Sequence, residues 1–210
     1  MSELYPIVDL DALARRGIDP IAFSERVLAA RPPRLQLRAK HASARTTLEL
    51  LRALVPLCAQ AGTQLFANDR PDLAVLAGSA GVHVGQHDLD VASVRRFAPN
   101  LLVGVSTHDF VQLEAALQDR PAYVAFGPVF QTESKLNPDP VVGLDGLRRA
   151  RAMAGAAGVP LVAIGGIDAA RARELAELDI SVAVISALLA PSLDEVEQCT
   201  RALMQTLAKS

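Results

Sequence analysis

Eight short apolar runs, each followed by a segment with helix-forming signals, repeat along the whole chain. The runs are rich in branched apolar residues and end in polar residues or glycine. Near-continuous apolar runs of this length are typical of strands that are covered on both faces, as in parallel sheets. The pattern predicts strands at 4–10, 34–39, 64–69, 81–85, 101–107, 123–129, 160–166 and 181–186.

The alternation of these runs with helical segments favours a closed (β/α)8 TIM barrel of the α/β class. The 210 residues contain no linker rich in Gly or Ser, no low-complexity tract and no block of charge that would divide them. We therefore expect residues 1–210 to form a single (β/α)8 barrel domain. An open, doubly wound sheet is the alternative, because a strand pattern alone does not prove closure.

The segments between the runs carry several helix-start signals. Thr46–Glu49 and Ser192–Glu195 fit capping boxes, and Asp168 fits an N-cap. Pro56 lies inside the helical segment that follows the second run, where it predicts a kink.

The composition excludes several classes of function. With a formal net charge of −2 and no Trp, the chain lacks the positive charge and the stacking side chains of a typical nucleic-acid-binding protein. No apolar run reaches the roughly 20 residues that span a bilayer, and residues 1–10 lack the basic start of a signal peptide. We expect a cytoplasmic protein with no nucleic-acid or membrane partner, and the sequence leaves a homo-oligomer open. Cys58 and Cys199 fall on apolar stripes, and we interpret them as core residues.

Polar residues and glycines gather where the predicted strands end. In (β/α)8 barrels the active site is built from the loops at the carboxyl ends of the strands, so these residues are expected to share one rim. The candidates are Gln36, Arg38, Lys40, Asn68, Asp69, His83, Gln86, Asp88, Ser106, His108, Thr132, Ser134, Lys135, Gly165, Gly166, Ile185 and Ser186.

Two carboxylates, Asp69 and Asp88, follow the neighbouring third and fourth strands. Adjacent carboxylates repel each other unless one is protonated or a cation lies between them. A hard divalent ion such as Mg²⁺ suits one or two carboxylates together with phosphate oxygens of a substrate. The alternative is that each aspartate caps the helix that follows it.

Lysine is scarce in this chain. Of the 21 Lys and Arg residues only three are lysines, namely Lys40, Lys135 and Lys209, and the third lies in the C-terminal tail. The use of lysine at two interior positions indicates a need for a compact charge rather than a planar fork. Arg38 and Lys40 lie two residues apart and so share one face if the second strand extends that far. With Lys135 they would concentrate positive charge opposite the carboxylates, as suits a phosphate-rich anion.

A second anion site is predicted after the seventh and eighth strands. Gly165 and Gly166 end the seventh strand, and Ile185 and Ser186 end the eighth. The loops at these positions commonly bind a phosphate in such barrels, through backbone N–H groups and a helix start.

Other polar residues allow two interpretations each. Ser106 fits either a helix N-cap or a substrate contact, and His83 fits either a packed or a functional histidine. His87 and His108 lack the spacing of a zinc site, and no cysteine is near them. The chain has neither a Gly-x-Ser-x-Gly motif nor a Walker-type loop, which disfavours a serine hydrolase or a P-loop NTPase.

In order along the chain, seven segments resemble those of the thiamine phosphate synthase family: LQLRAK, LFANDRPDLA, GVHVGQHDL, GVSTHD, YVAFGPVFQTESK, VAIGGI and VAVISAL. The similarity extends from residue 4 to residue 188. The wider family also contains thiazole tautomerases and has a (β/α)8 fold. Three features differ from its usual pattern: Gln131 stands in place of Pro, Ser134 in place of Thr, and Gly-Ala-Asp-Gly is missing before the last strand.

The resemblance implies an enzyme that joins a pyrimidine methyl diphosphate to a thiazole phosphate and releases pyrophosphate. It implies that Asp69 and Asp88 hold Mg²⁺. Contacts to the pyrimidine diphosphate are implied for Gln36, Arg38, Lys40, Asn68, Ser106 and Lys135, and contacts to the thiazole phosphate for Thr132, Ser134, Gly166, Ile185 and Ser186.

The implied mechanism is dissociative. The diphosphate leaves an electron-rich aminopyrimidine, and Arg38, Lys40 and Lys135 act as catalytic cations that neutralise it with the metal. Two alternatives compete with this function. A thiazole tautomerase would need a proton-transferring histidine and no diphosphate site, and a catalytically silent thiazole-phosphate-binding protein would bind both substrates without turnover.

Overall fold

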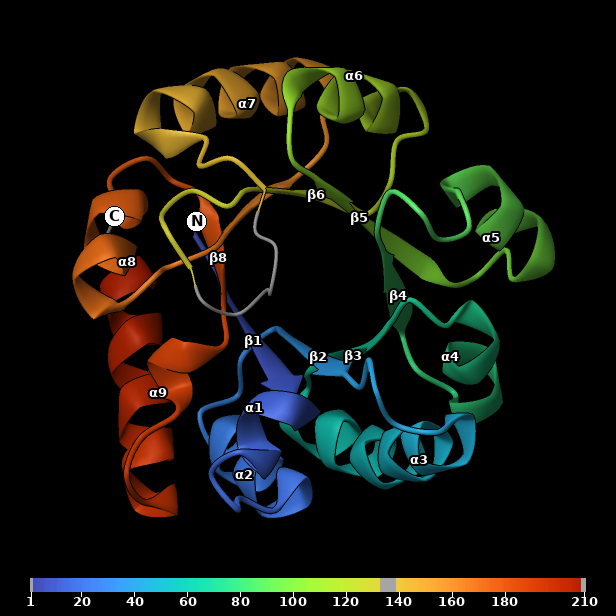
Figure 1. Ribbon diagram of the computed structural model, residues 1–210, viewed down its shortest axis with the longest axis vertical. Coiled ribbons are helices and arrows are strands. Elements are labelled where there is room, and N and C mark those ends of the chain that lie inside the picture. Colours follow the sequence, from blue (N-terminus) through green and yellow to red (C-terminus); the bar gives the residue numbers. More distant parts are fainter. Residues whose placement is uncertain (1, 133–138, 209–210) are drawn as a thin grey trace.

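The fold is a closed barrel of eight parallel strands, and helices surround it (Figure 1). The computed structural model describes residues 2–132 and 139–208. Each strand pairs with the next along the chain, and β1 also pairs with β8, with Leu4 opposite Val182. This pairing confirms the predicted (β/α)8 barrel and excludes the open sheet.

The strands lie close to their predicted positions. They are β1 (Leu4–Asp9), β2 (Arg34–Arg38), β3 (Gln64–Asn68), β4 (Gly81–Val84), β5 (Leu102–Thr107), β6 (Tyr123–Phe126), β7 (Leu161–Ile164) and β8 (Ser181–Val184).

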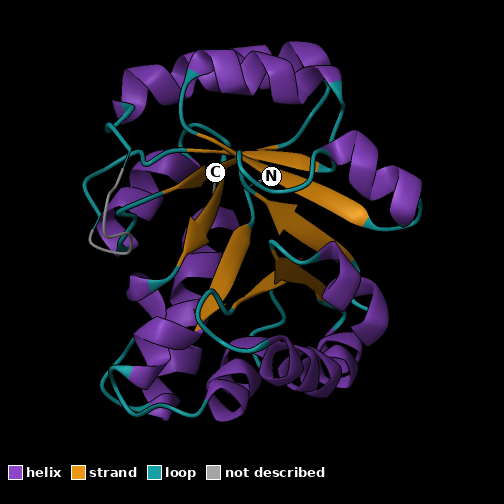
Figure 2. Cartoon of the chain, turned by 45° about the vertical axis from the view of Figure 1, so that its right-hand side comes forward, coloured by secondary structure: helices purple, strands orange, loops and turns teal. Residues whose placement is uncertain are grey.

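Helices cover the outer face of the barrel on all sides (Figure 2). Within the described residues they are α1 (Leu10–Ala14), α2 (Pro20–Leu28), α3 (Ala44–Ala61), α4 (Pro71–Ala77), α5 (Val91–Phe97), α6 (Phe110–Gln118), α7 (Gly143–Ala157), α8 (Ala169–Ala176) and α9 (Leu193–Ala208), with the short 3-10 helix η1 (Ser186–Leu188) after β8.

Side chains alternate between two apolar layers along each strand, as the period of a strand requires. In β3, for example, Leu65 and Ala67 belong to the outer core beneath the helices, whereas Phe66 points into the barrel. The outer layer is mostly aliphatic, with Phe23 and Phe126 among its buried members. The barrel interior is instead filled by the rings of Tyr5, Phe66 and Tyr123, whose centroids lie 5.5–5.9 Å apart in edge-to-face contacts.

The helix starts confirm two of the predicted caps and correct a third. The Asp168 side chain accepts from Arg171 N at the start of α8, and Ser192 Oγ bonds Glu195 at the start of α9. The N-cap of α3 is Ser43, three residues before the predicted Thr46, because the Ser43 hydroxyl accepts from Thr46 N.

Helix α3 continues through Pro56 to Ala61. Cys58 is buried in the outer core, as predicted, and burial raises the pKa of its thiol to about 12. Cys199 is only half-buried. Among the described residues, no helix is long and apolar enough to cross a membrane. That residues 1–210 form one domain stays a prediction, which a single cooperative unfolding transition would support.

The aromatic filling of the barrel depends on glycines in facing strands. A Cβ at Gly104 in β5 would lie 2.0 Å from the ring of Tyr123, and one at Gly81 in β4 would lie 2.3 Å from the ring of Phe66. Neither ring has room to retreat, because both are almost fully buried among the other interior side chains.

Gly104→Ala should therefore destabilise the protein by about 3 kcal/mol, because overpacking displaces a buried ring. The matched control is Gly155→Ala on the exposed side of α7, where a Cβ meets no atom within 4 Å. This control should raise the free energy of unfolding by roughly 0.5–1 kcal/mol through helix propensity. Urea denaturation of both variants checks the pair, and equal stabilities would contradict the packing argument.

Candidate active site

A cavity of about 390 Å³ opens at the carboxyl ends of the strands. Its floor is apolar and includes Ile7, Ile164 and Ala183, while its walls carry the polar residues of the strand ends. The rim predicted from the sequence is therefore one continuous site. Fourteen of the 17 predicted rim residues line it, namely Gln36, Arg38, Lys40, Asn68, Asp69, His83, Gln86, Asp88, Ser106, His108, Thr132, Gly165, Ile185 and Ser186.

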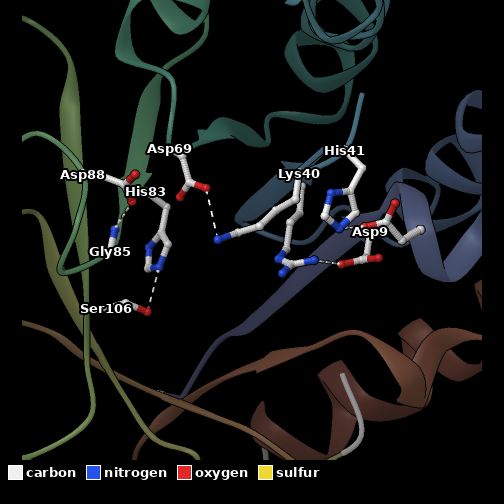
Figure 3. A network of polar contacts seen from close by, with 10 residues as sticks. Asp9, Lys40, His41, Asp69, His83, Gly85, Asp88 and Ser106 are labelled. Carbon is white, nitrogen blue, oxygen red and sulfur yellow. Dashed lines mark hydrogen bonds and ion pairs between the residues drawn. The ribbon is translucent and has the colours of Figure 1, made fainter. Parts of the chain in front are cut away.

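Asp69 and Asp88 lie together on one side of this cavity (Figure 3). Asp88 Oδ2 accepts from the backbone N of Gly85 at 2.7 Å, which fixes the carboxylate beside the end of β4. Neither aspartate caps a helix, since the N-cap of α4 is Arg70 and that of α5 is Asp90. The capping alternative is therefore wrong, and both carboxylates are directed to the site.

The backbone at Asp69 is left-handed, with φ of 63°. Its N–H donates to His83 O at 2.8 Å, which extends the pairing of β3 with β4 by one residue and turns the side chain toward the rim. Among residues other than glycine, Asp and Asn adopt this conformation most readily. The backbone conformation thus limits which residue types fit at position 69, in addition to any need for a carboxylate there.

The pKa of Asp69 is raised, first by burial and then by the negative charge of Asp88, and Lys40 opposes the shift. Lys40 Nζ lies 3.4 Å from Asp69 Oδ2. Two carboxylates share this corner of the cavity with one ammonium group, which leaves an excess of negative charge that a divalent cation would offset.

Arg38 is held by an acid that the sequence analysis did not select. Asp9, at the end of β1, is 5% exposed, and its Oδ2 pairs with Arg38 Nη1 while its Oδ1 caps α1 by accepting from Ala12 N at 2.8 Å. Strand β2 ends at Arg38, so Lys40 lies two residues beyond it and the two cations do not share a strand face. Neither of them stands opposite the carboxylates as a free charge. Arg38 pairs with Asp9 at the end of β1. Lys40 pairs with Asp69, which follows β3 (Figure 3).

The glycines after β7 allow close contact between two loops. Gly165 and Gly166 have φ of 101° and 65°, and a Cβ on Gly166 would lie 2.3 Å from Gln131 O. Gly165 lines the cavity, whereas Gly166 lies behind the wall against the loop after β6. Strand β8 ends at Val184, so Ile185 and Ser186 follow it rather than end it, and both line the cavity.

Ser106 and His83 interact inside the cavity. His83 is buried and points inward, and its Nε2 lies 3.2 Å from Ser106 Oγ. Helix α6 is capped by Asp109, so Ser106 is not its N-cap and its hydroxyl is directed to the site. His108 also lines the cavity, with Nδ1 2.6 Å from Gly127 O.

Two predicted residues, Ser134 and Lys135, lie outside the described residues. Residues that the sequence analysis missed include Asp9, Gln112 and Asp139, and the last two line the cavity. The polar end of the first apolar run, LYPIVD, was a signal for Asp9. Gln112 lies on a helix and Asp139 lies far past a strand end, so no strand-end pattern points to them.

The donor set suits Mg²⁺ better than a metal that is held only by protein ligands. Within residues 2–132 and 139–208, no group of three or more His, Cys, Asp or Glu side chains could hold a metal ion. Mg²⁺ retains several waters and is commonly bound through one or two carboxylates plus substrate phosphates. Asp69 and Asp88 supply such a pair at the cavity wall.

Comparisons with known proteins show the family of the chain. The model of the family described as thiamine monophosphate synthase matches residues 4–188. The chain belongs to the thiamine monophosphate synthase family. It is 44% identical over 200 residues to a thiamine-phosphate synthase from Koribacter versatilis, with 90% of each chain covered. It is 38% identical to one from Chloroflexus aurantiacus, with 95% of this chain and 90% of the relative covered.

Solved structures also place the barrel in the thiamine monophosphate synthase family. A thiamine phosphate pyrophosphorylase from Pyrococcus furiosus superposes with a TM-score of 0.84 at 28% identity, covering 99% of this chain and 96% of that one. A 3-hexulose-6-phosphate synthase superposes with a TM-score of 0.62 at 16% identity, and this likeness concerns the fold alone.

The buried ion pair predicts an asymmetric response to mutation. Arg38→Met should destabilise this family member by about 3 kcal/mol, because it leaves the Asp9 carboxylate buried without its cation. Asp9→Asn retains an oxygen that can cap α1, and Arg38 reaches the solvent of the cavity, so the cost should be about 1 kcal/mol. Urea denaturation gives both values, and equal costs would show that burial of Asp9 is not the cause.

Proposed function

We propose that the chain is a thiamine-phosphate synthase, a transferase that joins 4-amino-2-methyl-5-(diphosphooxymethyl)pyrimidine to thiazole phosphate. The products are thiamine monophosphate and pyrophosphate. The observation that carries the proposal is the single cavity in which the Asp69–Asp88 pair and the β2 cations face the loops after β7 and β8. Such a cavity can bind a diphosphate and a second phosphate at the same time.

The proposal agrees with the names of the relatives, which are thiamine-phosphate synthases. Because those relatives match along at least nine-tenths of their own length, the comparison concerns whole proteins rather than a shared module. Like the site residues, the cytoplasmic location and the oligomeric state stay predictions.

The diphosphate of the donor would lie between the acids that follow β3 and β4 and the two cations at and beyond the end of β2. Asp69 and Asp88 would hold Mg²⁺, which, when bound, offsets the charge of the leaving diphosphate. Lys40 opposes the rise in the pKa of Asp69 and so favours the ionised carboxylate that a metal requires. Arg38, oriented by Asp9, presents its remaining N–H groups to phosphate oxygens.

The pyrimidine ring would occupy the deeper, apolar part of the cavity. There, Gln36, Asn68 and Ser106 provide hydrogen-bonding groups above a floor of Ile7 and Ile164. The apolar floor excludes water from the methylene carbon, which becomes a cation when the diphosphate departs. Exclusion of water matters here, because water would otherwise capture this cation before the thiazole nitrogen does.

The acceptor would lie against the opposite wall. Thr132, Ile185 and Ser186 line that wall, and Gly166 shapes it from behind. We assign the phosphate of the thiazole to this region, together with Ser134. The attacking nitrogen carries no proton, so neither a general base nor a general acid is required for bond formation.

The two rival functions find no support. The relatives compared above carry the name of the synthase, and none is named a tautomerase or a binding protein. A tautomerase would also have no use for the acid pair beside Lys40 and Arg38. A silent binder would differ from the synthase in turnover, which the experiments below measure directly.

Replacing either acid by its amide should reduce release of pyrophosphate to background. Asp69→Asn keeps a side chain that tolerates the left-handed backbone, so the variant tests charge rather than folding. Asp90→Asn is the matched control, because Asp90 lies two residues from Asp88 but only caps α5, and Asn caps a helix about as well. Pyrophosphate is measured with both substrates, with Mg²⁺ and with EDTA. Wild-type rates in both Asp69→Asn and Asp88→Asn would contradict the assignment of these residues to the metal. Absence of turnover in the wild-type protein would contradict the proposed synthase function.

The lysine after β6 should act on the leaving group. Lys135→Ala should lower kcat about 100-fold, the cost of losing one electrostatic contact to charge that develops in the transition state. Lys135→Arg retains the charge and should recover part of the rate. Lys209→Ala, at the third lysine, is the control and should leave the rate unchanged. A Lys135→Ala enzyme with the wild-type kcat would contradict this role.

A further inference from the structure

A chain of hydrogen bonds crosses the barrel interior beneath the cavity. It links five side chains from five strands, in the order Gln36, Tyr5, Tyr123, His83 and Ser106. Gln36 Nε2 lies 3.1 Å from Tyr5 Oη, and the two tyrosine oxygens lie 2.8 Å apart. Tyr123 Oη lies 2.9 Å from His83 Nδ1, and His83 Nε2 lies 3.2 Å from Ser106 Oγ.

The chain is buried where it passes between the tyrosines. Tyr5, Tyr123 and Gln36 are at most 2% exposed, and apolar side chains such as Phe66 and Val162 surround the two rings. Burial raises the pKa of both tyrosines well above the ordinary value, so each hydroxyl keeps its hydrogen. Each phenol therefore has one hydrogen to donate and an oxygen that accepts.

These single hydrogens force one direction on the whole chain. Gln36 Nε2 can only donate, and its amide hydrogens act on the hydroxyls of both tyrosines, so neither tyrosine can donate to it. Tyr5 therefore turns its own hydrogen to Tyr123. Tyr123 then donates to His83 Nδ1. A neutral imidazole that accepts at Nδ1 carries its proton on Nε2, and this N–H donates to Ser106 Oγ. The hydrogen of Ser106 is left for the cavity.

We propose that Tyr5 and Tyr123 are positioning residues that hold His83 in the Nε2–H tautomer and thereby orient the two polar ends of the chain. At one end the Ser106 hydroxyl donates into the cavity. At the other end the Gln36 amide, with its nitrogen committed to Tyr5, has its carbonyl oxygen free as an acceptor. Both end residues line the cavity.

The fixed polarity selects a class of ring, a step that rests on the proposed function. A 4-aminopyrimidine offers an amino donor beside a ring-nitrogen acceptor, which complements an acceptor at Gln36 and a donor at Ser106. A 4-oxopyrimidine offers the reverse pattern, a carbonyl acceptor beside a ring N–H. A wall of fixed polarity rejects this reversed ring, because the mismatch leaves polar groups unpaired.

The tautomer can be measured in the ligand-free protein by ¹⁵N NMR with labelled histidine. The chain has four histidines, and a His83→Gln sample assigns the signal. In the wild type we expect a protonated Nε2 and an unprotonated Nδ1. Tyr123→Phe removes the hydroxyl that donates to His83 Nδ1, so the two tautomers should become mixed. Tyr5→Phe keeps the Tyr123 hydroxyl but removes the hydrogen bond that directs it, so the preference for the Nε2–H tautomer should weaken, though less than in Tyr123→Phe.

Phe66→Leu is the packing control, because Phe66 contacts both tyrosine rings and carries no polar atom. It should lower the melting temperature without changing the tautomer. A wild-type His83 in the Nδ1–H form overturns the proposal by itself, whether or not any variant folds. A Tyr123→Phe spectrum identical to that of the wild type would do the same.

Kinetics test the selection of the ring. The discrimination is the ratio of kcat/KM for the amino pyrimidine diphosphate to that for the oxo pyrimidine diphosphate. In Tyr123→Phe this ratio should be about tenfold smaller than in the wild type. The loss should come mainly from a higher KM for the amino substrate, and Phe66→Leu should keep the discrimination of the wild type. Unchanged discrimination in Tyr123→Phe would refute the selection. If the wild type shows no turnover, the proposed function fails, and the NMR result still decides whether the tyrosines position His83.

Discussion

Pairing of β1 with β8 is the constraint on which the rest of the structure depends. Closure gives every strand two neighbours, and it brings eight strand ends that are distant in sequence to one rim. It also creates an interior too narrow for anything except a few large side chains. The rings of Tyr5, Phe66 and Tyr123 fill it because Gly81 and Gly104 leave room in the facing strands. The packed interior then serves as a rigid floor for the cavity.

Charge at the rim is balanced locally before any ligand arrives. Arg38 pairs with Asp9 and Lys40 with Asp69, so the cations are held in defined positions and not left to search for a phosphate. Asp88 adds a further carboxylate, which leaves the corner of Asp69 and Asp88 with an excess of negative charge. Such preorganisation lowers the cost of reorientation when a charged group leaves the substrate.

Sequence reasoning was strongest where periodicity decides the outcome. Runs of branched apolar residues located all eight strands, and the rule that barrels use their strand ends found most of the cavity. It failed at one local signal, the N-cap of α3, and where contacts between distant segments decide. Ser43 rather than Thr46 begins α3, and Asp9 was recognisable as a strand end but not as the partner of Arg38. Nothing in the local sequence of Tyr5 or Tyr123 indicates that their hydroxyls meet inside the barrel.

The left-handed backbone at Asp69 has a consequence for the evolution of this fold. Most side chains are disfavoured there, so random change at this position mostly damages folding and is removed by selection. Asparagine is the exception, since it adopts the conformation readily, and a single nucleotide exchange separates its codons from those of aspartate. The mutation that keeps the barrel intact is thus also the one that removes the charge. A lineage released from selection for turnover could lose this carboxylate early and keep its architecture for a long time.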